Sequence, residues 1–174
     1  SLKSIINSFN PSGVALGKTL AEAFHRANMA DRVAAFGGAI ALNREVDRET
    51  AEMITAQYAE VVAAPEFAPG VMDVFGKKKN LRVMRVANMR RLQEFAGEIC
   101  VDFKSLIDGG LILQTSFVPQ ARRPSDLQPA RATVQGREVT IARQPTAAEM
   151  EDLLFGWLVE AGVSSNSVLY VRTG

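Results

Sequence analysis

Residues 33–64 read VAAFGGAIALNREVDRETAEMITAQYAEVVAA, and this stretch decides the fold class. Its first ten residues are almost wholly apolar, which predicts a buried strand over Val33–Leu42. Asp47 then predicts a helix N-cap, and Val61–Ala64 predicts a second short buried strand. The inner face of the intervening helix would consist of Met53, Ile54 and Tyr58. A strand, a helix and a strand in succession favour a layered α/β domain.

The flanking segments continue the alternation of helices and strands. Before the central stretch, apolar residues at helical spacing predict a helix that opens at Asn10-Pro11-Ser12-Gly13. These apolar residues are Leu16, Leu20, Phe24 and Ala27. After the central stretch, a short helix is predicted to end at Gly76. Its apolar face would consist of Val71, Met72 and Phe75.

The second half of the chain changes to a pattern of period two. Residues 99–115 predict two strands, and residues 133–141 predict a hairpin that turns at Gln135-Gly136. Thr146-Ala-Ala-Glu149 has the pattern of a capping box at the start of a helix, and residues 167–171 predict a final strand. An apolar stripe would pack that helix on the sheet, and it consists of Met150, Leu153, Leu154, Trp157, Leu158 and Ala161.

The composition is typical of a single globular domain. The 174 residues fit one domain spanning 1–174, and 20 basic against 19 acidic residues give a net charge of +1, which offers no global basic field for nucleic acid. The single Cys100 excludes a disulfide framework. No apolar run or N-terminal pattern indicates a membrane helix or a signal peptide. We therefore expect a cytoplasmic protein without nucleic-acid or membrane partners.

Three familiar kinds of catalytic site are absent from the sequence. A zinc deaminase needs a Pro-Cys-x-x-Cys pair and a further ligand, which one cysteine and one histidine cannot supply, so no metal is expected. His25 has no Gly-x-Ser-x-Gly elbow with which to form a hydrolase triad. Residues 13–19 lack one glycine that a phosphate loop requires.

Two local features each leave two interpretations open. The predicted helix start at Asn10–Gly13 could hold a phosphate or carboxylate, or it could be an ordinary capped start. Gly37-Gly38 after Phe36 could let the backbone approach a flat ligand, or it could form a tight bend in a buried strand. Lys77-Lys78-Lys79 is interpreted as a solvated connection rather than an anion site.

Several stretches, taken in order, resemble a single protein family. They are Asn10–Ala15, Ala35–Gly38, Asn43–Asp47, Glu60–Pro65, Lys77–Arg82, Gly109–Gln114 and Ser165–Val168. This ordered series resembles the formyltransferase part of the bifunctional purine-biosynthesis enzyme, AICAR transformylase/IMP cyclohydrolase, over almost the whole chain. The resemblance implies a three-layer αβα fold of the cytidine-deaminase-like kind, without the deaminase zinc.

The resemblance also implies a reaction and a set of site residues. In the family, the exocyclic amine of aminoimidazole carboxamide ribotide attacks the formyl group of the co-substrate 10-formyltetrahydrofolate. Phe36 and Gly37 would line the aminoimidazole pocket, and Asn10 would belong to the same substrate-binding set. Glu60 and Asn166 would make its polar contacts. Without a ligand role, Asn166 would be a strand-start cap and Glu60 an exposed helix end.

Two positions depart from the family pattern at the reacting centre. Where the family carries a catalytic Lys-His pair, this chain has Asn7 and Ser8. Asn7 could still donate a hydrogen bond to an oxyanion, whereas Ser8 cannot act as a general base near neutral pH. Compared with the family pattern, the chain also begins after an Arg-Tyr-Gly motif and ends before a glycine-rich continuation.

The sequence is compatible with three functions. The first is a formyltransferase of purine metabolism that acts alone or with a companion chain. The second is a non-catalytic ligand-binding or assembly module of the same fold, and the third is a specialised-metabolism paralogue with altered formyl chemistry. Because the family builds its formyltransferase site across a dimer interface, we expect a homodimer or a companion subunit.

Overall fold

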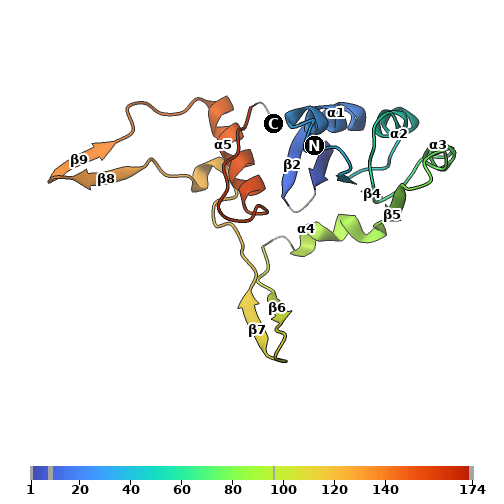
Figure 1. Ribbon diagram of the computed structural model, residues 1–174. Coiled ribbons are helices and arrows are strands. Elements are labelled where there is room, and N and C mark those ends of the chain that lie inside the picture. Colours follow the sequence, from blue (N-terminus) through green and yellow to red (C-terminus); the bar gives the residue numbers. More distant parts are fainter. Residues whose placement is uncertain (1, 8–9, 96, 173–174) are drawn as a thin grey trace. The chain divides into compact units, whose positions relative to one another are not determined.

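The computed structural model describes residues 2–7, 10–95 and 97–172. The chain divides into two compact units, Ser1–Glu94 and Phe95–Gly174. The first unit, blue to green in Figure 1, holds the main sheet and its helices, and the second, green to red, holds two hairpins and a long helix. The predicted site residues before position 61 all belong to the first unit.

A five-stranded mixed sheet forms the centre of the first unit. Its strand order is β2-β1-β3-β4-β5. β1 runs antiparallel to both of its neighbours, whereas β3, β4 and β5 are parallel to one another. The strands are β1 Leu2–Asn7, β2 Pro11–Gly17, β3 Ala39–Leu42, β4 Val61–Ala64 and β5 Arg82–Arg85.

Three helices of this unit begin or end at signals that the sequence contains. The Thr19 hydroxyl accepts the N–H of Glu22 at 3.1 Å, the Asp47 carboxylate accepts the N–H of Thr50 at 2.7 Å, and Gly76 follows the last residue of the third helix. These helices are α1 Leu20–Ala30, α2 Arg48–Thr55 and α3 Val71–Phe75. The remaining short helices of the chain are η1 Ala87–Arg91, α4 Leu92–Phe95 and η2 Pro124–Asp126.

The hydrophobic core of the first unit lies between these helices and one face of the sheet. Successive side chains of a strand point to opposite faces, so Val62 and Ala64 of β4 are buried while Val61 and Ala63 are only partly covered. Ile40 and Leu42 of β3 alternate in the same way. The largest fully buried side chains on the helices are those of Phe24, Phe75 and Ile54.

The second unit consists of two hairpins, a short helical turn and one long helix. β6 Val101–Ser105 pairs with β7 Leu111–Thr115, and β8 Arg131–Val134 pairs with β9 Arg137–Thr140. At the second hairpin turn, Gln135 and Gly136 have positive φ values of 49° and 77°, the backbone conformation of a type I′ turn. The long helix is α5 Ala147–Glu160, which begins at the capping box of Thr146 and Glu149.

Several sequence predictions are confirmed by this architecture. The first unit is α/β, with helices packed on a sheet that contains parallel strands, as the predicted αβα fold class requires. The strand at Val61–Ala64, the Asp47 cap, the turn at Gln135-Gly136 and the capping box at Thr146 all form as predicted. The cytidine-deaminase-like assignment and the single domain spanning 1–174 remain predictions.

The predicted helix start at Asn10-Pro11-Ser12-Gly13 is wrong. Pro11–Gly17 is a strand because it pairs with β1, with one bulge between the partners of Ile6 and Asn7, and the helix begins only after the Thr19 cap. A Cβ on Gly13 would lie 1.9 Å from the carbonyl oxygen of Ala27, so glycine allows α1 to pack directly on β2. The interpretation of this segment as an anion-binding helix start fails with it.

The predicted strand over Val33–Leu42 forms only in its second half. Residues 31–37 form turns, and only Ala39–Leu42 pair with neighbouring strands. The Asp31 carboxylate accepts the N–H of Ala34 at 2.9 Å, which stabilises the turn. Gly37 has a φ of +72°, which lies outside the strand region of the backbone.

The predictions for the end of the chain are also wrong. Residues 167–171 form no strand in the described part of the second unit, and Val171 instead packs on α5 where Gly156 has no side chain. Trp157 is 45% exposed, so the predicted apolar stripe of α5 is not fully buried.

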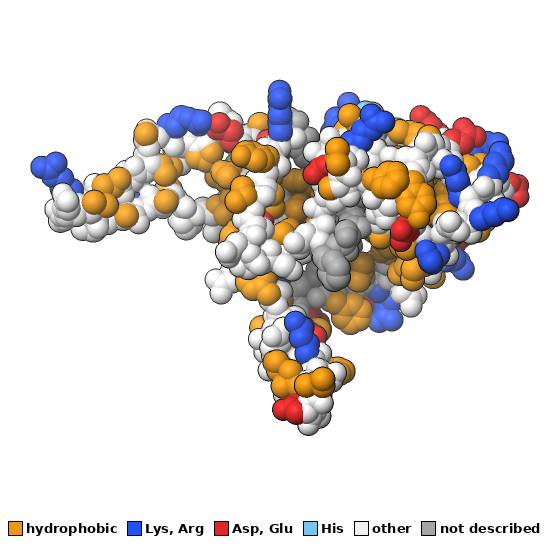
Figure 2. Space-filling model, viewed as in Figure 1, with side chains coloured by type: hydrophobic (Ala, Val, Ile, Leu, Met, Phe, Trp, Pro, Cys, Tyr) orange, Lys and Arg blue, Asp and Glu red, His pale blue; other side chains and the backbone are white. Residues whose placement is uncertain are grey.

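Met72, predicted on the inner face of α3, is likewise exposed. Hydrophobic side chains also reach the surface of the hairpins (Figure 2).

Candidate functional site

The candidate site lies at one edge of the sheet in the first unit, where the parallel strands β3 and β4 begin. Phe36 and Gly37 come shortly before β3, and Glu60 comes directly before β4. Asn7, the last residue of β1, pairs with Ala39, the first residue of β3. Because β1 runs antiparallel to β3, its end and the beginnings of β3 and β4 meet at this edge.

Backbone hydrogen bonds join the two segments that carry the candidate side chains. The N–H of Gly37 donates to the carbonyl of Tyr58 at 3.1 Å, and the N–H of Glu60 donates to the carbonyl of Gly38 at 3.2 Å. The N–H of Arg82 in turn donates to the carbonyl of Glu60 at 2.9 Å. The positions of Phe36 and Glu60 are therefore set by continuous backbone pairing with the sheet.

An aromatic pair and a carboxylate stand together on this edge. The ring centres of Phe36 and Tyr58 are 5.2 Å apart with an interplanar angle of 37°. The Tyr58 hydroxyl donates a hydrogen bond to Oε1 of Glu60 at 3.3 Å. Phe36 is 74% exposed. A flat ring with N–H groups would find both an aromatic surface and an acceptor here.

Tyr58 is a member of this group that the sequence prediction placed elsewhere. It was expected on the inner face of the helix, but α2 ends at Thr55 and Tyr58 lies beyond it, 41% exposed. Its four-residue spacing from Ile54 mimics a helical stripe, which explains the error. The signal that could have identified it is the alternation of Tyr58 and Glu60 directly before the strand at Val61.

The other predicted site residues are Asn10, Ser8 and Asn166. Asn10 is exposed and directly precedes β2, whose first residue, Pro11, pairs with Asn7. Ser8 lies outside the described residues. Asn166 belongs to the second unit, is exposed, and accepts a hydrogen bond from the Ser165 hydroxyl at 2.8 Å. The structure therefore brings Asn7, Phe36, Gly37 and Glu60 to one sheet edge. Asn166 does not start a strand, so its interpretation as a strand-start cap is wrong.

An ion pair stands after the carboxyl end of β4. Glu66 accepts hydrogen bonds from Nε and Nη2 of Arg85, the last residue of β5, at 3.1 and 2.5 Å. The Arg85 guanidinium, with a further contribution from the N–H of Phe67, holds the pKa of Glu66 below its ordinary value of 4.5. Both side chains are exposed, so the pair contributes little to stability.

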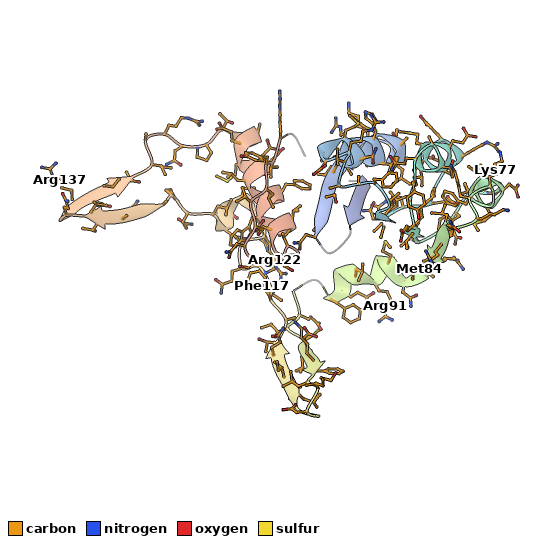
Figure 3. All side chains as sticks on the ribbon, in the orientation of Figure 1. Lys77, Met84, Arg91, Phe117, Arg122 and Arg137 are labelled. Carbon is orange, nitrogen blue, oxygen red and sulfur yellow. The ribbon has the colours of Figure 1, made fainter. Side chains whose placement is uncertain are left out.

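Each unit has a pocket among its described residues. Lys77 lies just after α3 (Figure 3), and with Lys78 and Lys79 it lines a pocket of about 420 Å³ beside residues 54–59. Because α2 and α3 both end there, the lysines offset the partial negative charge of two helix C-termini. This agrees with a solvated connection. The second pocket, of about 1090 Å³, lies beside α5 and includes Trp157.

Two further findings concern metals and membranes. Within residues 2–7, 10–95 and 97–172, no three His, Cys, Asp or Glu side chains are grouped so that they could hold a metal ion. No helix in this part of the chain is long and apolar enough to cross a membrane.

The chain is similar to known proteins of one family. A family model described as "AICARFT/IMPCHase bienzyme" matches residues 2–174. Two similar proteins, each called "Bifunctional purine biosynthesis protein PurH", come from Aquifex aeolicus (strain VF5) and Ruegeria sp. (strain TM1040). Each is 39% identical over 171 residues, which cover 98% of this chain and 29% of the relative. This protein belongs to the AICARFT/IMPCHase bienzyme family, as its ordered motifs predicted.

Proposed function

We propose that this chain is part of a purine-biosynthesis formyltransferase domain that binds aminoimidazole carboxamide ribotide. Its co-substrate would be 10-formyltetrahydrofolate, and residues 1–174 would belong to one domain. The observation that carries the proposal is the meeting of Asn7, Phe36, Gly37 and Glu60 at one sheet edge in a chain of this family. The chain spans 29% of the length of the relatives it matches, so it would hold only part of such a domain.

The ligand would be held through its flat base. The exposed ring of Phe36 offers an aromatic surface, and the absence of a side chain at Gly37 lets the Tyr58 ring pack directly on the backbone next to it. The Glu60 carboxylate can accept hydrogen bonds from the exocyclic amine or the carboxamide N–H groups. Asn10 would supply a further amide contact, as the family resemblance implies.

Formyl transfer requires proton movements that this chain supports poorly. The amine nitrogen forms a bond to the formyl carbon and an oxyanion develops; the oxyanion then collapses as the bond to N10 of the folate breaks, while the amine loses a proton and N10 takes one up. Asn7 can donate a hydrogen bond to the oxyanion. The hydroxyl of Ser8 does not accept a proton near neutral pH, and loss of a general base typically costs about 10²–10⁴ in rate.

The substitutions at Asn7 and Ser8 favour a second candidate function. A chain that retains the binding edge but lacks the Lys-His pair fits a non-catalytic ligand-binding or assembly module. In either case we propose that a second chain, another copy or a companion subunit, completes the site. Sedimentation at high concentration, with and without the ribotide, tests this, and a monomer under both conditions with no copurifying partner would exclude it.

The two candidate functions are separated by measuring binding and turnover on the same variants. Isothermal titration with the ribotide should show binding by both the unmodified chain and the double variant Asn7→Lys/Ser8→His. A spectrophotometric assay of tetrahydrofolate release should show no turnover, or only a trace, for the unmodified chain and a higher rate for the double variant.

Three results would contradict these expectations. Absence of ribotide binding by the unmodified chain would exclude the proposed function. Rapid turnover by the unmodified chain would exclude the non-catalytic alternative. A double variant that stays inactive would contradict the role given to the two positions.

A further inference from the structure

Tyr58 contacts Phe36 through its ring, Gly37 through its ring and backbone carbonyl, and Glu60 through its hydroxyl. We propose that Tyr58 is a positioning residue that holds the Glu60 carboxylate and the Phe36 ring in place for a planar ligand bearing N–H groups. This inference rests on the proposed function, because Phe36, Gly37 and Glu60 are the residues assigned there to the base of the ribotide.

The position of Tyr58 is itself closely determined. Its carbonyl accepts the N–H of Gly37 at 3.1 Å. The Cβ position of Gly37 lies 3.3 Å from Cε1 and 3.5 Å from Cδ1 of the Tyr58 ring. The ring is therefore packed on the backbone at Gly37, with Phe36 on the same segment at a ring-centre distance of 5.2 Å.

The Tyr58 hydroxyl orients the carboxylate of Glu60. It donates to Oε1 at 3.3 Å, and the same oxygen lies 3.9 Å from the Cβ position of Gly37. Among the described residues, Oε2 of Glu60 receives no protein hydrogen bond, so this oxygen remains available to accept an N–H of a ligand. A carboxylate already held by one donor loses less conformational freedom when the ligand binds.

The alternative to a ligand role is that Tyr58 only stabilises the fold. Its ring is 41% exposed and does not belong to the buried core of the first unit. A tyrosine that supported the core would direct its ring between the helices and the sheet. Here the ring and hydroxyl instead contact three residues of the candidate site.

A double-mutant cycle tests the proposal. Affinity for aminoimidazole carboxamide ribotide is measured by titration calorimetry on the unmodified chain, Tyr58→Phe, Glu60→Ala and the double variant. Tyr58→Phe keeps the ring and removes the hydroxyl, and we expect roughly three- to tenfold weaker binding from loss of one hydrogen bond. In the Glu60→Ala background, which has no acceptor for the Tyr58 hydroxyl, the same change should have little further effect because the two side chains act through one contact.

The matched control is Tyr170→Phe. Tyr170 is the other tyrosine of the chain and is 98% exposed. The Tyr170→Phe variant should bind the ribotide with the same affinity as the unmodified chain. Circular-dichroism melts accompany every variant, and Tyr58→Phe should melt within a few degrees of the unmodified chain. Tyr58→Leu, which also removes the aromatic contact, should weaken binding further while retaining the folded spectrum.

The possible results distinguish a failure of the proposed function from a failure of the role given to Tyr58. Absence of ribotide binding by the unmodified chain would exclude the proposed function and this inference together. Normal binding by the unmodified chain and by Tyr58→Phe would exclude only the role of Tyr58. Additive effects of the two substitutions, or a large fall in melting temperature for Tyr58→Phe, would show a merely structural tyrosine.

Discussion

Replacing Gly37 by alanine perturbs the candidate site at its backbone. Gly37 has a φ of +72°, and a Cβ there would lie 3.3 Å from Cε1 of Tyr58 and 3.9 Å from Oε1 of Glu60. Gly70 provides a matched control in the same unit. Its φ is +82°, and its nearest neighbour to a new Cβ is the end of the Arg48 side chain at 3.8 Å, an ordinary contact.

The two substitutions should cost similar stability. An L-residue in the left-handed region costs about 1–2 kcal/mol. Replacing glycine also removes freedom from the unfolded chain, which offsets roughly 0.4–1 kcal/mol. We expect a net loss of about 1 kcal/mol for either variant, or a fall in melting temperature of about 4–8 °C for a unit of this size. The Tyr58 ring, being partly exposed, can move by the few tenths of an ångström that the new methyl group requires.

Their effects on the ligand should differ. In Gly37→Ala the shifted Tyr58 ring no longer holds the Glu60 carboxylate and the Phe36 ring in the positions proposed for the ligand, which costs the ligand about one hydrogen bond, roughly 0.5–1.5 kcal/mol. Gly37→Ala should therefore weaken ribotide binding by roughly three- to tenfold, while Gly70→Ala leaves the affinity unchanged. Circular dichroism monitors unfolding and titration calorimetry monitors binding. Equal affinities for the two variants, with equal melting temperatures, would refute the reasoning.

Two further predictions concern stability. Phe24→Ala should destabilise the first unit by about 3–5 kcal/mol because its side chain is only 2% exposed, whereas Phe103→Ala, 66% exposed, should cost less than about 1 kcal/mol by the same thermal melts. The Arg143 guanidinium and the N–H of Thr146 lower the pKa of Glu149 from an ordinary 4.5 to about 2. The stabilisation that these two contacts give the folded protein is therefore complete above pH 4.5 and is lost as the pH falls towards 2. An acid titration followed by fluorescence of Trp157, the sole tryptophan, should show this component in the unmodified protein, and its persistence in Glu149→Gln would contradict the assignment.

Local features of this protein follow from the sequence because their causes are local. A carboxylate or hydroxyl three residues before an N–H forms the caps at Asp47 and Thr146 whatever surrounds them. Gln135-Gly136 turns its hairpin because the two positions take positive φ. The family, too, is determined by the sequence, since ordered motifs along the chain specify it without reference to contacts.

Tertiary pairing decided what the local pattern left ambiguous. Pro11–Gly17 has helical apolar spacing with the residues that follow, yet it is a strand because β1 offers it a partner. The predicted site residues Asn7, Phe36, Gly37 and Glu60 are distant in sequence, and only the strand register places them at one edge. Tyr58 joins them because α2 stops at Thr55 and the next strand starts at Val61, which turns its ring from the predicted core toward Phe36 and Glu60.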